Sequence, residues 1–542
     1  MMHKKSPFLL LLLLIIFSGC SSLRLATNRH DVKMLRIAQQ IRNHYVDVVD
    51  AQALTEAAIR AMVSQLDPYS DYFNAVQTRA ARDAMRRNFF GIGADAVMIA
   101  DTLHVTRILE DSPAQKAGLM WGDQIIYINN TLVAGVETPF LELVELLQGE
   151  RGATVDLSVL RRNSPDLINL RIAFDRVSIS SIDIAYMLTD DIGYIRLNRF
   201  SAATAREFRE ALRMLREQGM EHLVLDLMDN NGGLSSAMTS VAGEFLERGT
   251  RIGYREARRW IYRRARYRAG SGGEMLSGKV VVLVSEQTAS ASEILVGALQ
   301  DWDRAVIVGR RTWGKALGQR RFSQGGDTSL NLTVTHFRTP SGRIIQIPFE
   351  ENDMEAYRER VRNRIYHAEM FNVDSIQLSD LHRYTTLVNN RTVFGGGGIL
   401  PDYFVVMDSL GIHLFRNLVE KGVIHSVVMS EVGDNRDELL YRYPDITAFQ
   451  NNFQLPEDMT DRVRGLAKVR EIEWCDEQFE GAYSRIVNRL KGVMALGLFG
   501  EQASIKILNE SSPIFQEGLR IISDPERYEN LLRGIGSNVG RR

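Results

Sequence analysis

The sequence is poor in cysteine and carries almost no excess of charge. Among 542 residues, Cys20 and Cys475 are the two cysteines, which excludes a zinc–thiolate cluster and a disulfide framework. The 66 lysines and arginines nearly balance 67 acidic residues, so the overall charge gives no indication of a nucleic-acid partner. Because the chain is too long for one hydrophobic core, we expect three or more domains that are stabilised by packing alone.

Long apolar runs are also missing, with one short exception near the N-terminus. Phe8–Phe17 is an unbroken apolar stretch that follows two lysines and is too short to cross a bilayer as a helix. Small residues and then Cys20 follow it, which resembles the lipobox of bacterial lipoproteins. We therefore expect residues 1–19 to be a signal peptide and Cys20 to be lipidated. The alternative is an ordinary cleaved signal with an incidental cysteine.

The residue after the expected lipidation site bears on location. Ser21, rather than an aspartate, follows Cys20, which is typical of sorting to the outer membrane. The expected location is the bacterial cell envelope, with a lipid anchor, facing the periplasm, and with the outer membrane favoured over the inner one.

Hydrophobic periodicity divides the remaining chain into four regions. Residues 20–85 have helical spacing, and residues 86–177 alternate short β-rich runs with turns. Residues 178–406 alternate strands with helices, and residues 407–542 are helical almost throughout. The predicted fold class is multidomain α/β (α+β), with an α/β layer structure in the third region.

An arginine-rich stretch interrupts the third region. Residues 251–268 combine many arginines with Trp260, a composition that a polyanion-binding patch can have. One local run without a basic domain is more typical of a solvated hairpin, and we favour that interpretation.

The strongest chemical signal is a serine at a predicted strand-to-helix turn. Ser290 follows the apolar run Val280–Val284 and opens a predicted helix. Unpaired backbone N–H groups and the helix dipole at such a position favour developing negative charge. The structural alternative is a helix N-cap, a position that serine also favours.

A lysine and a glutamine shift the balance toward catalysis. A serine nucleophile needs a base, and a desolvated lysine such as Lys315 can supply one, with Gln319 orienting its amine. None of the ten histidines lies in a loop of the kind that a Ser-His-Asp site uses. Gly232 and Gly233 end another predicted strand, and their N–H groups, with that of Ala291, could form an oxyanion hole. A tight turn that needs glycine is the alternative for this pair.

Together these elements resemble the carboxyl-terminal processing (tail-specific) protease family of Ser-Lys serine peptidases. The resemblance covers roughly residues 35–405. Its marks are Thr288–Glu293, Asp301–Gly309, Gly314-Lys315 with Gln319, Thr339–Arg343 with Gln346, Gly397–Asp402, Tyr45–Asp47 and Leu66–Ser70. The resemblance implies a ClpP/crotonase-like α/β peptidase domain, and the interval of 25 residues to Lys315 implies Ser290, not Ser292, as nucleophile.

The β-rich region resembles the PDZ domain that this family carries. Phe90, Gly91, Ile92 and Gly93 match its carboxylate-binding loop. Successive backbone N–H groups in such a loop form a nest for a terminal carboxylate, and the peptide adds as a strand to the sheet edge. The alternative is a small β fold with glycine turns and no ligand.

These observations predict a serine endopeptidase that captures apolar, disordered C-terminal tails of exported proteins. Ser290 attacks, Lys315 moves the proton and Gln319 orients Lys315, and the resemblance implies no metal or organic cofactor. A conventional Ser-His-Asp hydrolase is an alternative. The C-terminal helical region could support the peptidase domain, form a lid or make an oligomer contact, and the sequence does not choose among them.

The other alternative is a catalytically weak or inactive PDZ adaptor lipoprotein. The chain departs from the family pattern near the glycine pair and Lys315, at Met228, Asn231, Ala316 and Gly318. None of these departures removes a side chain that is assigned to chemistry.

Overall fold

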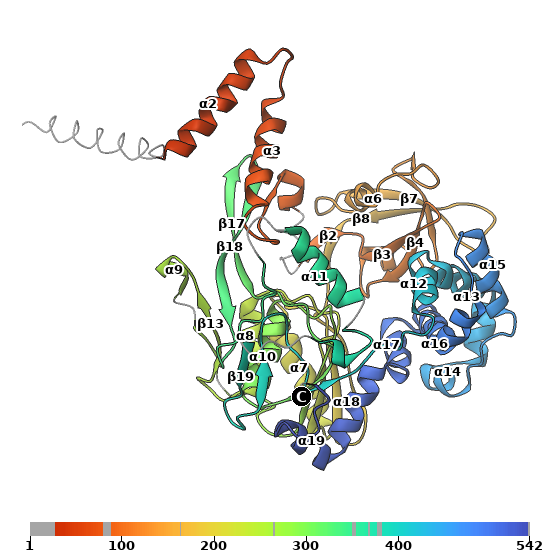
Figure 1. Ribbon diagram of the computed structural model, residues 1–542. Helices are drawn as coiled ribbons and strands as arrows, with labels where there is room; N and C mark the ends of the chain where they lie inside the picture. Colours follow the sequence, from red (N-terminus) through yellow and green to blue (C-terminus); the bar gives the residue numbers. More distant parts are fainter. Residues whose placement is uncertain are drawn as a thin grey trace, which may run out of the picture. The chain divides into compact units, whose positions relative to one another are not determined.

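Two compact units make up the chain, Met1–Tyr72 and Phe73–Arg542. The computed structural model (Figure 1) describes residues 28–79, 88–162, 164–263, 266–270, 272–349, 354–366, 369–376 and 382–539. The expected signal peptide and Cys20 lie outside these ranges. Within them, every helix is too short or too polar to cross a bilayer.

The first unit contains two capped helices. The Asn28 side chain accepts a hydrogen bond from the second residue of α2 (Arg29–His44), and Asp50 caps α3 (Ala51–Val63) in the same way. None of the residues of α2 is buried. The helical spacing predicted within residues 20–85 is confirmed for α2 and α3, and the first of these helices ends at His44.

A small antiparallel sheet forms the first part of the second unit. Its strands are ordered β3-β4-β5-β7-β8, with β6 paired to β5, so β3 lies at an edge. Its elements are β3 (Ala94–Ile99), β4 (Thr102–Ile108), α5 (Pro113–Lys116), β5 (Gln124–Ile128), β6 (Thr131–Leu132), α6 (Phe140–Leu146), β7 (Thr154–Leu160) and β8 (Ile168–Ala173). A ribbon of β2 (Asn88–Gly91) and β9 (Asp175–Ser178) flanks this sheet in the sequence.

The central sheet of the second unit has six strands in the order β10-β11-β12-β15-β16-β21. Only β10 runs antiparallel to its neighbour. The strands are β10 (Ile182–Met187), β11 (Ile192–Leu197), β12 (His222–Asp226), β15 (Val280–Val284), β16 (Val306–Gly309) and β21 (Tyr403–Phe404). The parallel strands are nearly continuous apolar runs because helices cover both faces of the sheet.

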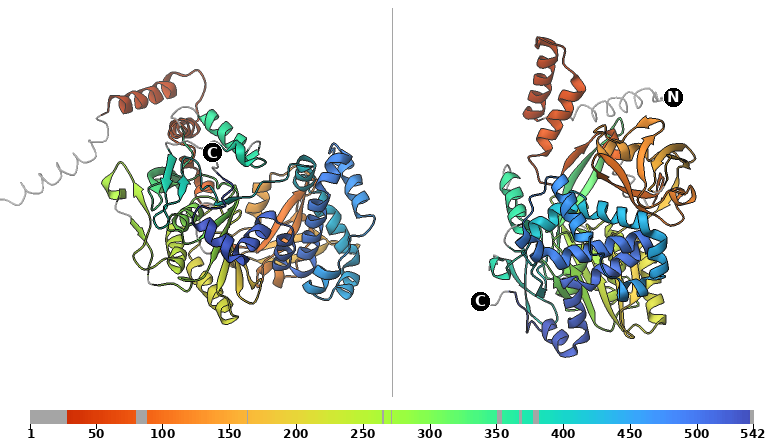
Figure 2. Two further views of the ribbon diagram at one scale, coloured as in Figure 1. Left: turned by 60° about the horizontal axis from the view of Figure 1, so that its bottom comes forward. Right: turned by 90° about the vertical axis from the view of Figure 1, so that its right-hand side faces the viewer.

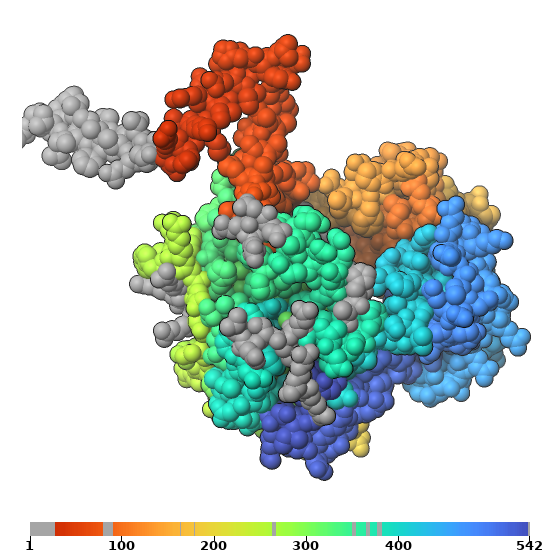
Figure 3. All heavy atoms as spheres, viewed as in Figure 1, coloured from red at the N-terminus to blue at the C-terminus, as the bar shows by residue number. Residues whose placement is uncertain are grey.

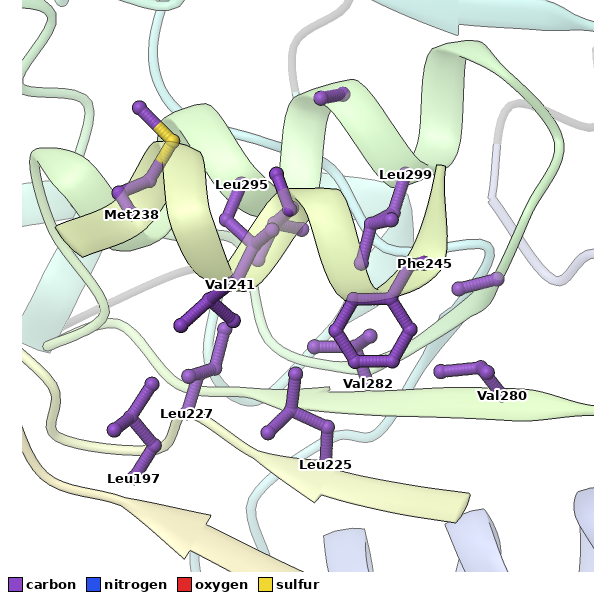
Figure 4. Packing of buried hydrophobic residues seen from close by; sticks show 14 of the residues in the cluster. Leu197, Leu225, Leu227, Met238, Val241, Phe245, Val280, Val282, Leu295 and Leu299 are labelled. Carbon is purple, nitrogen blue, oxygen red and sulfur yellow. The ribbon is translucent and has the colours of Figure 1, made fainter. Parts of the chain in front are cut away.

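One face of this sheet packs against α7 (Thr204–Glu217), α8 (Ser235–Phe245) and α10 (Ala291–Asp301). In Figure 4, Phe245 of α8 and Leu299 of α10 lie over the strands with the other fully buried apolar side chains. The alternation of strand and helix that the sequence indicates for this region is therefore confirmed.

The opposite face packs against the last three helices of the chain, α17 (Glu501–Glu510), α18 (Pro513–Ser523) and α19 (Pro525–Leu532). The ring of Phe515 lies edge-on to Tyr194, with 5.4 Å between the ring centroids. The Tyr528 hydroxyl accepts a hydrogen bond of 3.0 Å from the Val280 N–H. These three helices therefore support the peptidase sheet, which is one of the roles that the sequence left open.

Five earlier helices form a bundle with its own apolar core, and Figures 1 and 2 show it beside the small antiparallel sheet. They are α12 (Ile412–Glu420), α13 (Val423–Arg442), α14 (Ile446–Asn452), α15 (Met459–Val469) and α16 (Asp476–Phe499). Trp121 packs against the bundle core. Arg162 donates to Asp434 of α13 at 2.5 and 2.8 Å, and Arg107 of β4 donates to Glu501 at 2.7 Å.

A further sheet in this unit has the neighbouring strands β17 (Leu317–Gly325), β18 (Thr328–Arg338), β13 (Arg251–Glu256) and β14 (Arg266–Arg268). The arginine-rich stretch is an antiparallel hairpin of β13 and β14, with α9 (Trp260–Arg263) between them. The stretch thus forms a hairpin, as the sequence indicates. The remaining elements are α11 (Met354–Tyr366), the 3₁₀ helix Val373–Ser375, β19 (Arg383–Thr385) and β20 (Thr392–Phe394).

Replacing Asp301 with alanine is expected to destabilise the peptidase domain strongly. Asp301 and Arg343 form an ion pair in which both side chains are fully buried. Removing one partner leaves an uncompensated buried charge, which costs about 3–5 kcal/mol of unfolding free energy. Urea denaturation measures the difference, with Glu438→Ala in the exposed Glu438–Arg442 pair as control. A similarly small change in both variants would contradict the expectation.

Candidate active site

The backbone at Ser290 has an unusual conformation. Ser290 is half-buried at the N-terminus of α10, with φ 58° and ψ −116°. This combination is unfavourable for a residue with a Cβ and costs of order 1–3 kcal/mol, so the surrounding structure must hold it. Strain of this kind is concentrated at active sites, and it was not readable from the sequence.

Ser292, the neighbouring candidate, is placed differently. Its side chain is fully buried, and its hydroxyl donates a hydrogen bond of 3.0 Å to the Asn230 carbonyl. A buried hydroxyl that is committed to a backbone carbonyl is poorly placed to attack a substrate. The geometry therefore favours Ser290 over Ser292.

The glycine pair lies directly against the serine turn. A Cβ on Gly232 would lie 2.8 Å from Ser290 Cβ and from the Ala291 nitrogen, so only glycine fits there. The Gly232 N–H donates to Asn230 Oδ1 at 2.9 Å. It is thus already engaged, which leaves Gly233 and Ala291 as the candidate oxyanion donors. Ala291 is the first residue of α10, where a helix has no internal acceptor for the N–H.

Asn230, which the sequence analysis gave no role, fastens this turn. Its side-chain amide donates to the Leu197 carbonyl at 2.7 Å, and its backbone carbonyl accepts from the Ala289 N–H at 3.0 Å. Asn230 is fully buried, and its hydrogen bonds join the glycine turn, β11 and the serine turn.

A buried carboxylate connects the serine turn to the lysine loop. Glu293 Oε2 accepts from the Ser290 N–H at 2.9 Å and from the Lys315 N–H at 2.8 Å. Its Oε1 accepts from the Gly314 N–H at 2.7 Å and from the Thr312 hydroxyl at 2.5 Å. One side chain thus brings the backbones of Ser290 and Lys315, 25 residues apart in the sequence, to a common point.

Burial has an electrostatic consequence for Glu293. Because the carboxylate is removed from water, its pKa rises from 4.5 to about 7, although its four hydrogen bonds oppose the rise. The sequence signal that could have found it is the glutamate three residues after a serine, which is the pattern of a capping box.

The lysine loop is held from the other side by the glycine-rich segment near residue 398. A Cβ on Gly314 would lie 2.9 Å from the Gly398 nitrogen, and the Ile399 N–H donates to the Thr312 hydroxyl at 2.7 Å. Lys315 itself is half-buried. Gln319 lies four residues on, within β17, and is also half-buried.

A buried charge network lies beneath the glycine turn. Asp226, at the end of β12, accepts from the Tyr194 hydroxyl at 2.6 Å and from the Met228 N–H at 2.7 Å. Burial raises the pKa of Asp226, while the nearby Arg196 opposes that rise. Met228, one of the departures from the family pattern, thus takes part through its backbone.

The expected carboxylate-binding residues Phe90–Gly93 span the end of β2 and the connection to β3, with Phe90 and Gly91 still paired to β9. Phe90 is 40% exposed and Ile92 is buried. The carbonyls of Ile92 and Gly93 accept from the N–H groups of Ala114 and Leu109 inside the domain, at 2.7 and 3.0 Å. The loop therefore leads into β3, the strand at the edge of the sheet.

The described residues contain no group of three or more His, Cys, Asp or Glu side chains that could hold a metal ion. What the site offers is a strained serine, a lysine, a glycine turn and a helix N-terminus. These are the parts that hydrolysis through a covalent intermediate requires.

Comparison with known families gives four matches along the chain. Peptidase family S41 matches residues 191–355, and PDZ domain matches residues 104–161. Activating protease CtpB N-terminal domain matches residues 23–77. The fourth match, residues 414–500, is to a family of unknown function (DUF8443), and it corresponds to the bundle α12–α16.

Among curated proteins, the chain is 32% identical over 314 residues to a carboxy-terminal-processing protease of Bartonella bacilliformis, covering 57% of this chain and 71% of that protein. This chain belongs to the carboxyl-terminal processing protease family. The identity is 30% over 321 residues with carboxy-terminal processing protease CtpA of Bacillus subtilis, covering 58% and 66%. The predicted family, fold class and serine-type peptidase are thereby confirmed.

Solved structures give matches of lower overall similarity. The photosystem II D1 C-terminal processing protease is 27% identical with a TM-score of 0.34, covering 58% of this chain and 90% of that one. The PDZ domain of a carboxy-terminal protease from Vibrio cholerae is 26% identical with a TM-score of 0.16, covering 17% and 99%.

Replacing Glu293 with glutamine is expected to change how stability depends on pH. Between pH 4.5 and about 7 the unfolded chain releases this proton while the folded chain retains it. Stability therefore falls as pH rises through this window, by about 3 kcal/mol in total, and levels off above it. The Glu293→Gln variant should not show this pH dependence of stability. Its kcat should also fall by about a hundredfold, because Ser290 and Lys315 are displaced.

Urea denaturation at several pH values tests this expectation, because the difference between wild type and variant isolates Glu293 from other buried acids. Glu438→Gln, on the exposed side of α13, is the control, and its stability should depend on pH in the same way as that of wild type. Parallel pH curves for Glu293→Gln and wild type would contradict the assignment.

Proposed function

We propose that the chain is a serine endopeptidase in which Ser290 and Lys315 form a catalytic dyad. The observation that carries the proposal is the single carboxylate of Glu293, which binds the backbone N–H of both residues. Two side chains that start from neighbouring backbone positions can approach each other closely. Family membership supports the same assignment.

The reaction begins when the Ser290 hydroxyl attacks a peptide carbonyl. Neutral Lys315 accepts the hydroxyl proton and then transfers it to the leaving amine, which departs as the acyl-enzyme forms. Water then attacks the acyl-enzyme by the same proton transfer and regenerates Ser290. Gln319 orients the lysine amine from β17. The N–H groups of Gly233 and Ala291 stabilise the oxyanion, with the positive end of α10 behind them.

The small antiparallel sheet would capture the substrate's C-terminal tail. The tail would add as a strand to the free edge of β3, and its carboxylate would bind the loop Phe90–Gly93. The expected substrates are exported polypeptides with apolar, disordered C-termini. A lipid anchor at Cys20 would hold the enzyme in the cell envelope, facing the periplasm, at the outer membrane in preference to the inner one.

The experiment that tests the proposal is digestion of an unfolded protein with an apolar C-terminus, followed by mass spectrometry. Wild type should cleave it, and Ser290→Ala and Lys315→Met should not, while circular dichroism shows that both remain folded. Cleavage by both variants would contradict the dyad. Tail binding without cleavage by wild type would favour the adaptor alternative instead, and loss of activity with a histidine-directed reagent would favour a Ser-His-Asp hydrolase.

Replacing Ser290 with glycine should abolish activity and yet stabilise the fold. At φ 58° and ψ −116°, glycine has no Cβ to strain, so about 1 kcal/mol should be gained after its larger unfolded-state entropy is counted. Ser290→Ala keeps the Cβ and is the matched control, which should gain nothing from this source. Equal stability of the two variants in urea denaturation would contradict the strain.

Blocking the substrate's terminal carboxylate should weaken its capture. If the loop Phe90–Gly93 binds that group, an amidated tail loses charge-assisted hydrogen bonds worth about 1.5–3 kcal/mol, and KM rises by about tenfold or more. A pair of otherwise identical peptides, one amidated, makes this comparison. An unchanged KM would show that the tail is recognised in another way.

A further inference from the structure

A strongly basic surface lies on the peptidase domain, away from any role in the proposed chemistry. Residues 251–268 contain eight arginines and one glutamate. They form the hairpin β13-α9-β14, which stands at the margin of the second unit in yellow-green in Figures 1 and 3. We define the arginine surface by the exposed arginines of this hairpin and of β17, which pairs with β18 in the same sheet: Arg251, Arg258, Arg259, Arg268 and Arg320.

Aromatic rings, rather than acids, hold several of the guanidinium groups. The guanidinium carbon of Arg320 lies 5.7 Å from the ring centroid of Tyr262 and 5.3 Å from that of Phe322. Arg251 stacks in the same way on Tyr254, at 5.9 Å. A contact with a ring leaves the positive charge of the guanidinium in place, and guanidinium N–H groups can donate to phosphate.

Acidic residues are scarce in the sequence of the hairpin itself. The one glutamate of the hairpin, Glu256, pairs with Arg338 of β18 at 2.7 Å. That pair leaves the arginines of the hairpin with a large local excess of positive charge, although the whole chain is nearly neutral.

Two large apolar side chains are exposed in the same hairpin. Trp260 is 62% exposed and Ile261 is 45% exposed, both on α9 and directly after Arg258 and Arg259. An exposed tryptophan and an aliphatic residue beside arginines match the chemistry of a bilayer surface, where indole rings settle at headgroup level and guanidinium groups bind lipid phosphates.

We propose that the arginine surface binds anionic lipid headgroups, with Trp260 and Ile261 inserted at the level of those headgroups. Charge complementarity and the exposed apolar pair together select a membrane over a soluble polyanion. A nucleic acid would use aromatic rings as stacking platforms, and here Tyr262 and Tyr254 are already covered by guanidinium groups. Only residues of the second unit are involved, so the proposal is independent of lipidation at Cys20.

Membrane contact would orient the peptidase, because β17 carries both Arg320 and Gln319. The strand runs from the lysine loop directly into the arginine surface. A peptidase domain held at the lipid surface by this sheet would present its catalytic cleft in a fixed direction to chains that emerge near the bilayer.

The test uses the full chain bound to vesicles that contain brominated phosphatidylcholine, with or without phosphatidylglycerol. Bromine atoms on the acyl chains close to the glycerol quench a tryptophan whose ring reaches the boundary between headgroups and acyl chains. The difference between wild type and Trp260→Phe isolates Trp260 from the other four tryptophans. We expect strong quenching of Trp260 with phosphatidylglycerol, little without it, and a decrease at high salt because the attraction is screened.

Arg258→Gln combined with Arg259→Gln should lower the ratio of docked to free hairpin by about fivefold for each arginine. The matched control removes two exposed arginines elsewhere, Arg442→Gln and Arg520→Gln, and should behave as wild type. Cleavage of a short soluble peptide should be unchanged in both double variants, which separates failure of this proposal from failure of the catalytic one.

Equal quenching of Trp260 in neutral and anionic vesicles would overturn the proposal. So would an equal loss of quenching in the Arg258/Arg259 double variant and in the Arg442/Arg520 control. So would a Trp260 signal that responds to single-stranded nucleic acid or to an acidic polypeptide but not to phosphatidylglycerol, because the surface would then bind a soluble polyanion.

Discussion

The carboxylate of Glu293 is the interaction on which the site depends. It is fully buried at the start of α10 and accepts hydrogen bonds from Ser290, Thr312, Gly314 and Lys315. Without it, the strained serine turn and the lysine loop would each have unsatisfied backbone donors, and one backbone bond, from the Trp313 N–H to the Thr288 carbonyl, would still join them. The pKa of Glu293 is raised because the carboxylate that binds the two backbone segments is buried away from water.

The positions of both segments depend in turn on the central sheet. Parallel strands place the ends of β12, β15 and β16 at one edge, where the glycine turn, Ser290 and the lysine loop follow them. Helices must cover both faces of such a sheet, and here the last three helices of the chain cover the second face. The bundle before them contacts the small antiparallel sheet through Arg162 and Trp121. The C-terminal region therefore links the expected tail-binding sheet to the peptidase sheet.

The strands and helices of the central sheet could be predicted closely from the sequence, because doubly covered strands are unbroken apolar runs. Val280–Val284, for example, is a strand with the bounds of the apolar run that the sequence shows. The hairpin β17–β18 was missed. β17 shows no apolar alternation, but β18 alternates at Leu330, Leu332 and Val334, which is a strand signal that the sequence offered. Local pattern also could not reveal that Asn230 engages the Gly232 N–H, since that bond depends on the folded shape of the turn.

The most direct test of the account is to map where a fluorophosphonate probe attaches, using peptide mass spectrometry of wild type and Lys315→Met. One adduct is expected, on Ser290, and none in the folded Lys315→Met variant. An adduct on another residue, such as Ser292, or equal labelling with and without Lys315, would contradict the Ser290–Lys315 dyad.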